Sequence, residues 1–153
     1  MDKLGKWDIN NDPECVFCKT SPETSAHLFW DCFFTTQLWL RVFRWLQVPI
    51  PTNVHLQQWF FRATKGNSKR AKLLKQVCTD TLYSFWTERS TRIFDKMQRA
   101  PEELVKEMAC IFIVRATGDL RSYLLGLVFS FNFFDESLLV LLTVIVVGLV
   151  WSS

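Results

Sequence analysis

The 153-residue sequence contains none of the short motifs that build common active sites. It has no G-x-x-x-x-G-K-[ST] phosphate loop, no G-x-S-x-G nucleophile motif and no pair of carboxylates in a convincing catalytic context. It also has no internal repeat and no low-complexity segment. These absences predict that the chain is not an enzyme and has no small-molecule substrate.

The chain also lacks the apolar opening of a secretory signal, because its first 14 residues are polar. It has five cysteines, an odd number, so we do not expect a disulfide framework. Cysteines in a reducing compartment are more often metal ligands or buried side chains. We therefore expect a nuclear or cytoplasmic location, with a membrane location as the alternative that the C-terminal tail suggests.

Charge is distributed unevenly along the chain. The first 118 residues carry 17 basic and 12 acidic side chains, whereas residues 119–153 carry one basic and three acidic side chains. The hydrophobic fraction of 49% excludes a disordered chain. A mild positive excess in the body permits nucleic-acid binding without requiring it.

One cluster of metal-ligand residues stands out near the N-terminus. Cys15, Cys18, His27 and Cys32 follow the pattern C-x2-C-x8-H-x4-C. Thiolates and imidazole suit the tetrahedral geometry of Zn²⁺, and a closed Cys3His set is typical of structural rather than catalytic zinc. The alternative, ordinary buried residues, is less favoured because all four lie within 18 residues. The other candidates are interpreted as core packing (Cys78, Cys110) and as a surface or helix-start residue (His55).

The spacing within this cluster predicts an irregular backbone. His27 and Cys32 would point roughly 140° apart on a straight helix, at about 100° per residue. They can share a metal only if the chain bends or turns between them. We therefore expect a regular helix to start near Phe33.

Apolar periodicity after this loop predicts helices over residues 33–46, 54–63, 69–98 and 101–116. Ser68 is the expected cap of the third helix, and the Ala100-Pro101-Glu102-Glu103 segment has the features of a helix start. The predicted fold is mainly α, with a small Cys3His zinc loop, a helical domain and a hydrophobic C-terminal helical tail. We place one domain at 1–118 and the tail at 119–153. The expected core aromatics are Trp39, Trp45, Trp86 and Phe94.

A run of basic residues without an acid surrounds the loop at Gly66 and follows the aromatic segment 59–61. Basic and aromatic side chains together can hold phosphates and stack on bases. The alternative, which we favour slightly, is a solvated helix face with the aromatics in the core. The candidate nucleic-acid contacts are Arg62, Lys65, Lys69, Arg70, Lys72 and Lys75.

The tail over residues 122–151 is apolar except for Asp135 and Glu136. Its longest uninterrupted apolar run, 137–151, is shorter than the roughly 20 residues that a helix needs to span a bilayer. Burying a carboxylate at the bilayer centre costs on the order of 3 kcal/mol. Two interpretations remain: a membrane anchor, or an apolar helical hairpin that turns near 132–137.

Two segments resemble one known family. The first comprises Cys15-Val-Phe-Cys18, Glu23, the stretch His27-Leu28-Phe29-Trp30-Asp31-Cys32, and Trp39. It resembles the zinc-binding domain that follows the polymerase in plant LINE-type (non-LTR) retrotransposons. The second, FWTERSTRIF at 85–94, resembles that family's W-x-E-R-N-x-R-I-F segment, with Ser90 where asparagine is usual. The resemblance covers roughly residues 3–117.

The resemblance implies a Zn²⁺-binding module that holds template RNA or target DNA near a polymerase. The chain has no candidates for the polymerase's catalytic aspartates, and it starts just before the zinc loop. We therefore expect an N-terminally truncated part of a retroelement reading frame. Three hypotheses follow: a non-catalytic nucleic-acid-binding module, a small membrane-anchored protein, or a relic without a selected function. The sequence does not indicate an oligomeric state.

Overall fold

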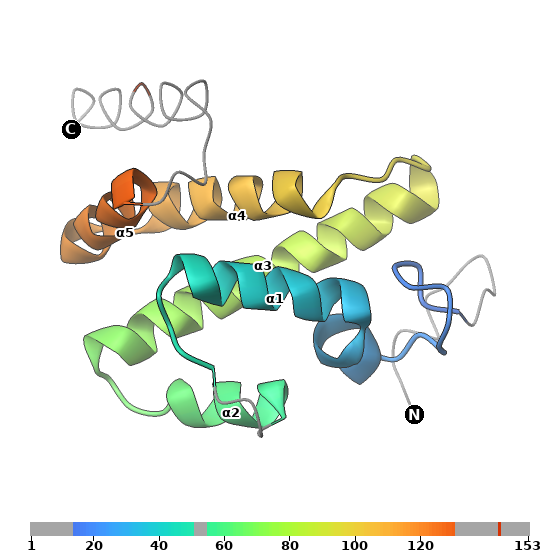
Figure 1. The fold of residues 1–153 in the computed structure, drawn as a ribbon, viewed down its shortest axis with the longest axis horizontal. Helices are drawn as coiled ribbons and strands as arrows, with labels where there is room; N and C mark the ends of the chain where they lie inside the picture. The colour runs from blue at the N-terminus through green and yellow to red at the C-terminus, as the bar shows by residue number, and fades with distance from the viewer. Residues whose placement is uncertain (1–13, 51–54, 131–143, 145–153) are drawn as a thin grey trace.

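The computed structural model describes residues 14–50, 55–130 and 144. Within these residues the chain is mainly helical and has no β-strand, which confirms the predicted fold class. The elements are a short π-helix, η2 (His27–Asp31), followed by α1 (Phe33–Trp45), α2 (Leu56–Ala63), α3 (Lys69–Phe94), α4 (Pro101–Arg115) and α5 (Gly118–Ser130). Figure 1 shows α3 as the long helix that passes behind α1 and leads into α4.

The helix boundaries follow the local sequence signals. Ser68 caps α3, because its hydroxyl accepts a hydrogen bond of 3.1 Å from the backbone N–H of Ala71. Pro101 opens α4, where a missing N–H costs nothing, and the Glu103 carboxylate accepts a bond of 3.3 Å from the N–H of Ala100. α1 ends at Trp45, and Gln47 adopts a left-handed conformation with φ of 56°. All four predicted helices are present, but α3 ends at Phe94 rather than at the predicted residue 98, because the chain turns at Lys96, which has a left-handed φ of 57°.

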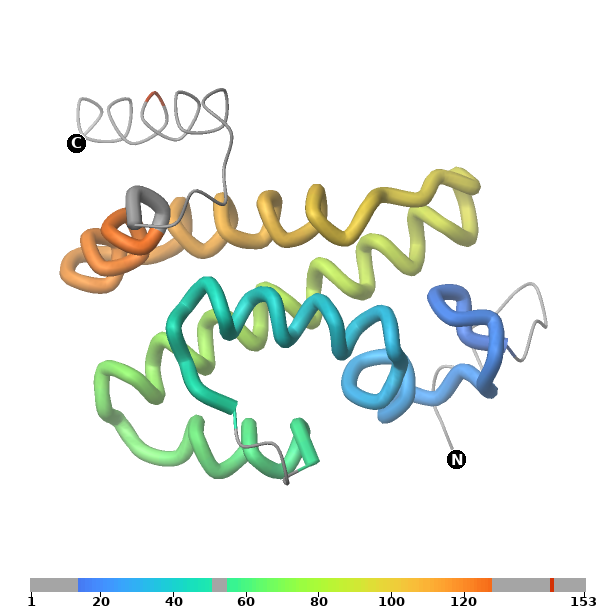
Figure 2. Tube along the Cα trace, in the orientation of Figure 1, coloured from blue at the N-terminus to red at the C-terminus, as the bar shows by residue number. Residues whose placement is uncertain are grey.

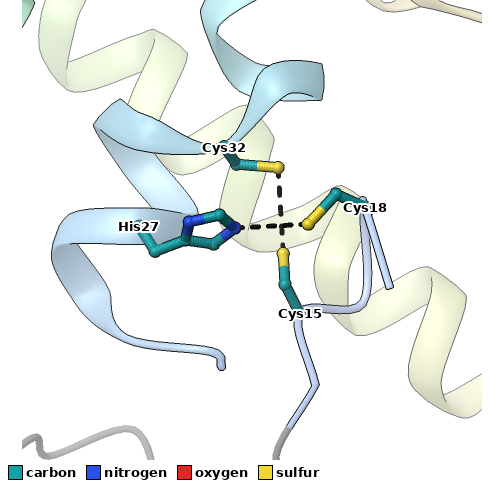
Figure 3. Close-up of side chains that lie close together, drawn as sticks. All are labelled: Cys15, Cys18, His27 and Cys32. Carbon is teal, nitrogen blue, oxygen red and sulfur yellow. Dashed lines mark hydrogen bonds between the residues drawn. The ribbon is translucent and has the colours of Figure 1, made fainter. Parts of the chain in front are cut away.

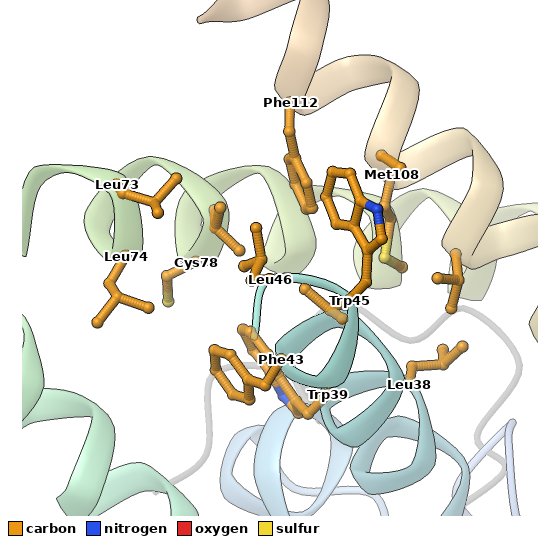
Figure 4. Packing of buried hydrophobic residues seen from close by; sticks show 14 of the residues in the cluster. Leu38, Trp39, Phe43, Trp45, Leu46, Leu73, Leu74, Cys78, Met108 and Phe112 are labelled. Atoms are coloured by element: carbon orange, nitrogen blue, oxygen red, sulfur yellow. The ribbon is translucent and has the colours of Figure 1, made fainter. Parts of the chain in front are cut away.

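The main core lies where α1, α3 and α4 meet. α4 packs against both α1 and α3, and α5 packs against α4. Trp39 is fully buried and stacks on Trp30 and Phe43, with ring centroids 5.1 and 5.4 Å away. Figure 4 shows this packing at the C-terminal half of α1, with Leu38, Trp39, Phe43, Trp45, Leu46, Leu73, Leu74, Cys78, Met108 and Phe112 labelled.

The predicted core aromatics divide into two pairs. Trp39 and Trp45 are buried at 0% and 2% exposure, as expected. The prediction for Trp86 and Phe94 was wrong, since these side chains are 40% and 69% exposed. The buried face of this part of α3 instead carries Glu88, and two arginines that follow it. Ion pairs neutralise these charges. The charged face can therefore be buried, while Trp86 and Phe94 stay exposed.

A second, smaller core lies beneath the N-terminal loop. It contains Cys15, Val16, Phe17, Leu28 and Cys32. In the trace of Figure 2 this loop lies at one end of the molecule's long axis and α5 lies at the other. The loop therefore has its own packing and contacts the helical body through few side chains.

The start of the predicted tail is helical. Leu124 and Leu127 of α5 are buried in the main core, and the Tyr123 hydroxyl donates a 3.3 Å hydrogen bond to the carbonyl of Leu46. The domain boundary at 118 stays a prediction. None of the helices among the described residues has the length and hydropathy needed to cross a membrane. The apolar run 137–151 lies outside the described residues, apart from the exposed Val144.

Candidate metal centre

The four predicted ligands converge on one point. The ligand atoms of Cys15, Cys18, His27 and Cys32 all lie within 4.8 Å of one another. Figure 3 shows Cys15 and Cys18 approaching from the N-terminal turn, with His27 and Cys32 facing them from the segment that leads into α1. The structure therefore brings together the whole set that the C-x2-C-x8-H-x4-C spacing predicted.

A tight turn holds the first pair of ligands. The N–H of Lys19 donates to the carbonyl of Cys15 over 2.9 Å, and Lys19 has a left-handed φ of 57°. The N–H of Cys15 then bonds to the carbonyl of Ser21 over 2.8 Å, closing the base of the turn. This geometry places both sulfurs on the same side of the loop.

A π-helical turn holds the second pair. Over η2 the backbone bonds run from residue i+5 to residue i, and the last of them joins the N–H of Cys32 to the carbonyl of His27 over 2.7 Å. Cys32 itself is extended, with φ of −65° and ψ of 134°, and it ends this turn before α1 begins. The bend predicted between His27 and Cys32 is confirmed. It takes the form of one wide helical turn.

Two of the ligand–ligand distances are close to those around a tetrahedral zinc ion. Zinc–sulfur bonds of about 2.3 Å at tetrahedral angles place two sulfurs about 3.8 Å apart. The Cys15 and Cys32 sulfurs are 3.8 Å apart, and the Cys18 sulfur lies 3.3 Å from Nε2 of His27. Four protein ligands fill the coordination sphere, so the arrangement is that of a structural site with no position for a substrate.

Without a metal the ligands share protons in pairs. The hydrogen bond between Cys15 and Cys32, together with burial, raises the pKa of the Cys15 thiol well above its usual range. The same hydrogen bond lowers the pKa of Cys32. Burial would raise the pKa of Cys18 and lower that of His27, but hydrogen bonds outweigh burial and shift both the other way. A bound cation replaces these shared protons, so binding releases protons and strengthens as pH rises.

One known family matches the N-terminal part of the chain. Residues 1–39 match the family described as zinc-binding in reverse transcriptase. The match covers all four ligands and the start of α1. It supports a reverse transcriptase zinc-binding domain at the N-terminal end. No curated protein and no solved structure matches the chain.

This zinc-binding domain is fixed to α3 by a buried ion pair. The Glu23 carboxylate accepts from Nε and Nη2 of Arg89 over 2.7 and 2.5 Å, and from the N–H of Val16 over 3.1 Å. The two charged side chains are only 6% and 8% exposed. Val16 lies inside the C-x2-C turn, so one carboxylate ties the metal-binding turn to the long helix.

A second arginine supports the same contact. The Arg92 guanidinium lies over the rings of Phe17 and Phe34, at 5.0 and 4.4 Å from their centroids. Its Nε also donates to Glu88 over 2.8 Å. Glu88, Arg89 and Arg92 lie in the segment 85–94 that resembles the family's motif, but the resemblance predicted no role for them. Arg89 and Arg92 follow Phe85 at helical spacing, so they lie on the same face of the helix as this ring. That spacing could have predicted that both arginines face inward.

The remaining candidates lie apart from the metal centre. Cys78 is buried in the main core, and Cys110 is half-buried against it, as expected. His55 is half-exposed and pairs with Asp31 over 3.0 Å. All six residues of the predicted basic run are exposed, namely Arg62, Lys65, Lys69, Arg70, Lys72 and Lys75. Of the neighbouring aromatics Phe60 is buried, Trp59 is partly buried and Phe61 is 58% exposed.

Proposed function

We propose that this protein is a non-catalytic nucleic-acid-binding module, held in shape by one structural zinc ion and derived from the reverse transcriptase of a plant LINE-type retrotransposon. The observation that carries the proposal is the closed Cys3His cluster, with its 3.8 Å sulfur–sulfur distance. Zn²⁺ is the cation that this ligand set suits best. Its four ligands would be Cys15, Cys18, His27 and Cys32.

The metal would stabilise the fold, because it joins the N-terminal turn to the segment that precedes α1. The small core beneath the loop has five buried residues, two of which are ligands. So little apolar surface stabilises the loop weakly without a metal. Zinc binding would therefore supply most of the free energy that orders residues 14–32.

Nucleic-acid contact is supported by the basic run. Its six residues are exposed, and they surround the turn between α2 and α3. Lys75 donates a 2.8 Å hydrogen bond to the carbonyl of Gly66, which folds the loop against the first turns of α3. These positive side chains near one turn would act as a patch. A patch of this kind attracts phosphates and gives binding that weakens with salt.

The zinc proposal is tested by the metal content of the purified full chain. We expect one zinc per chain in the wild type and in Cys78→Ser and Cys110→Ser, whose sulfurs lie outside the cluster. Cys15→Ser and His27→Ala should lose the metal. A folded wild type without zinc would contradict the proposal.

The nucleic-acid proposal is tested by fluorescence anisotropy at 50 and 200 mM salt. Replacing the six basic residues with glutamine should remove most binding and reduce the slope of log affinity against log salt. Arg44→Gln with Lys96→Gln, two exposed cations outside the patch, should change little. Absence of salt-sensitive binding in the wild type would sink this part of the proposal.

A further inference from the structure

Almost all exposed side chains of α3 are either cationic or aromatic. Its first two turns expose only cations, which are Lys69, Arg70, Lys72 and Lys75. After Thr79 the exposed side chains are all aromatic, namely Tyr83, Trp86 and Phe94. No acidic and no aliphatic side chain of α3 is classed as exposed. One helix therefore presents a basic half and an aromatic half on its outer surface.

The absence of acids on this surface results from burial. Both acids of α3 face inward: Asp80 pairs with Arg115 over 2.5 Å, and Glu88 pairs with arginines over 2.8 Å. Two other acids of the described residues lie near α3. Asp119 pairs with Lys69 over 3.3 Å, and Asp95 directly follows the end of the helix. The outer surface of α3 is thus complementary to an anion along its basic half.

One residue of the basic half and two residues of the aromatic half lie on one line along α3. Lys72, Tyr83 and Phe94 are spaced by eleven residues, which is about three helical turns, so they align along the axis with roughly 16 Å between neighbours. The distance from first to last is about 33 Å. At the 3.4 Å per nucleotide of a stacked strand, this line accommodates roughly ten nucleotides.

The aromatic half favours a single strand over a duplex. Tyr83 and Phe94 are 65% and 69% exposed, so their ring faces are open to a partner. Trp86 has the Arg89 guanidinium 5.2 Å from its ring centroid, which supports one face and leaves the ring 40% exposed. Aromatic faces stack on unpaired bases, whereas a duplex hides its base faces inside the helix.

We propose that the outer surface of α3 binds single-stranded nucleic acid, with phosphates at Lys69, Lys72 and Lys75 and bases stacked on Tyr83, Trp86 and Phe94. This inference rests on the proposed nucleic-acid function and adds the strand class and the residues that select it. The aromatic contacts come from the C-terminal half of α3.

The test compares strand classes with the zinc-loaded full chain. The probes are a labelled 12-nucleotide oligo(dT), an oligo(U) of the same length and a 12-base-pair duplex, measured by anisotropy at 50 mM salt. We expect the single strands to bind at least tenfold more tightly than the duplex. Equal affinity for oligo(dT) and oligo(U), or a preference for either, supports the inference and assigns the sugar that the surface accepts.

Variants separate stacking from charge. Tyr83→Ala with Phe94→Ala should weaken oligo(dT) binding roughly 25-fold, from about fivefold per lost stack, and change duplex binding less than twofold. The control, Phe33→Ala, removes a ring of α1 that is 75% exposed and should leave both affinities unchanged. Lys72→Gln with Lys75→Gln should weaken both probes. Zinc content and circular dichroism report whether each variant is folded.

Three results would overturn the inference. If the duplex binds as well as the single strand and the aromatic variant binds normally, the proposed function stands and the strand assignment fails. If the wild type self-associates in sedimentation velocity and only the aromatic variant is monomeric, without any loss of oligo(dT) affinity, the surface is a contact between two copies of the chain. Absence of binding to all three probes would overturn the proposed function as well.

Discussion

Replacing Glu23 with glutamine removes the charge that joins the ligand loop to α3 while leaving every metal ligand in place. The Glu23 carboxylate contacts both the Val16 N–H and the Arg89 guanidinium. Glutamine keeps the size of the side chain and one acceptor oxygen. The substitution therefore leaves Arg89 buried, at 8% exposure, without a countercharge from the loop.

The magnitude follows from that burial. Removing one partner of a buried ion pair costs about 3–5 kcal/mol, because the other charge remains desolvated. Glutamine still accepts one hydrogen bond, so we expect the lower end, about 3 kcal/mol, for Glu23→Gln. Arg89→Gln should cost about the same, and the double variant about as much as either single variant. A coupling energy of about 3 kcal/mol follows.

Urea unfolding of the zinc-loaded full chain measures this double-mutant cycle. The control is the exposed pair of Lys69 and Asp119, whose side chains are 91% and 90% exposed, for which we expect no measurable coupling. The cycle is then repeated with excess EDTA, where the coupling should vanish because the loop is no longer ordered. If the losses of unfolding free energy from Glu23→Gln and Arg89→Gln add in the double variant of the zinc-loaded protein, the reasoning is refuted. The two side chains would then not join the loop to the helix.

Three further predictions follow from packing, charge and metal. Trp39→Ala should lower the unfolding free energy by about 3–5 kcal/mol. Phe94→Ala, at 69% exposure, should lower it by less than about 0.5 kcal/mol. Equal losses of unfolding free energy, measured in urea, would contradict the assigned core. Burial alone would raise the pKa of Glu88, but hydrogen bonds from two arginines lower it below its ordinary 4.5, so its stabilisation is present above pH 4.5 and is lost as pH falls through the lower folded pKa. Glu88→Gln should therefore flatten the acid limb of a stability–pH curve, and an unchanged limb would disprove this. EDTA should speed tryptic cleavage after Lys19, in the metal-binding turn, while the helical circular dichroism of α1 and α3–α5 persists; loss of the whole helical signal would show that the two cores unfold together.

Local signals predicted the metal cluster and the helix boundaries well. The ligand spacing identified all four residues because soft ligands were rare elsewhere in the chain. The same spacing required a bend before Cys32, since two ligands five residues apart diverge on a regular helix. Ser68 and Pro101 marked helix starts because capping depends on a few adjacent residues.

The sequence did not predict which face of α3 turns inward near its end. Trp86 and Phe94 looked like core residues because large aromatics usually bury. The face that is buried carries Glu88, Arg89 and Arg92, whose charges are neutralised by partners as distant as Glu23, 66 residues from Arg89. Such pairing depends on tertiary contacts, which cannot be predicted from the hydrophobicity of single residues.

The π-helical turn at His27–Asp31 has a consequence for how this module can evolve. Its wide turn brings a histidine and a cysteine five positions apart into one cluster. Deleting a single residue between them would restore an ordinary α-turn and shift every later residue by about 100° around the axis of α1. Either Trp39 would then leave the core or the Cys32 sulfur would leave the cluster. The segment should therefore accept neither insertions nor deletions, and its length is as strict a marker of the module as His27 and the buried Leu28 and Trp30 within it.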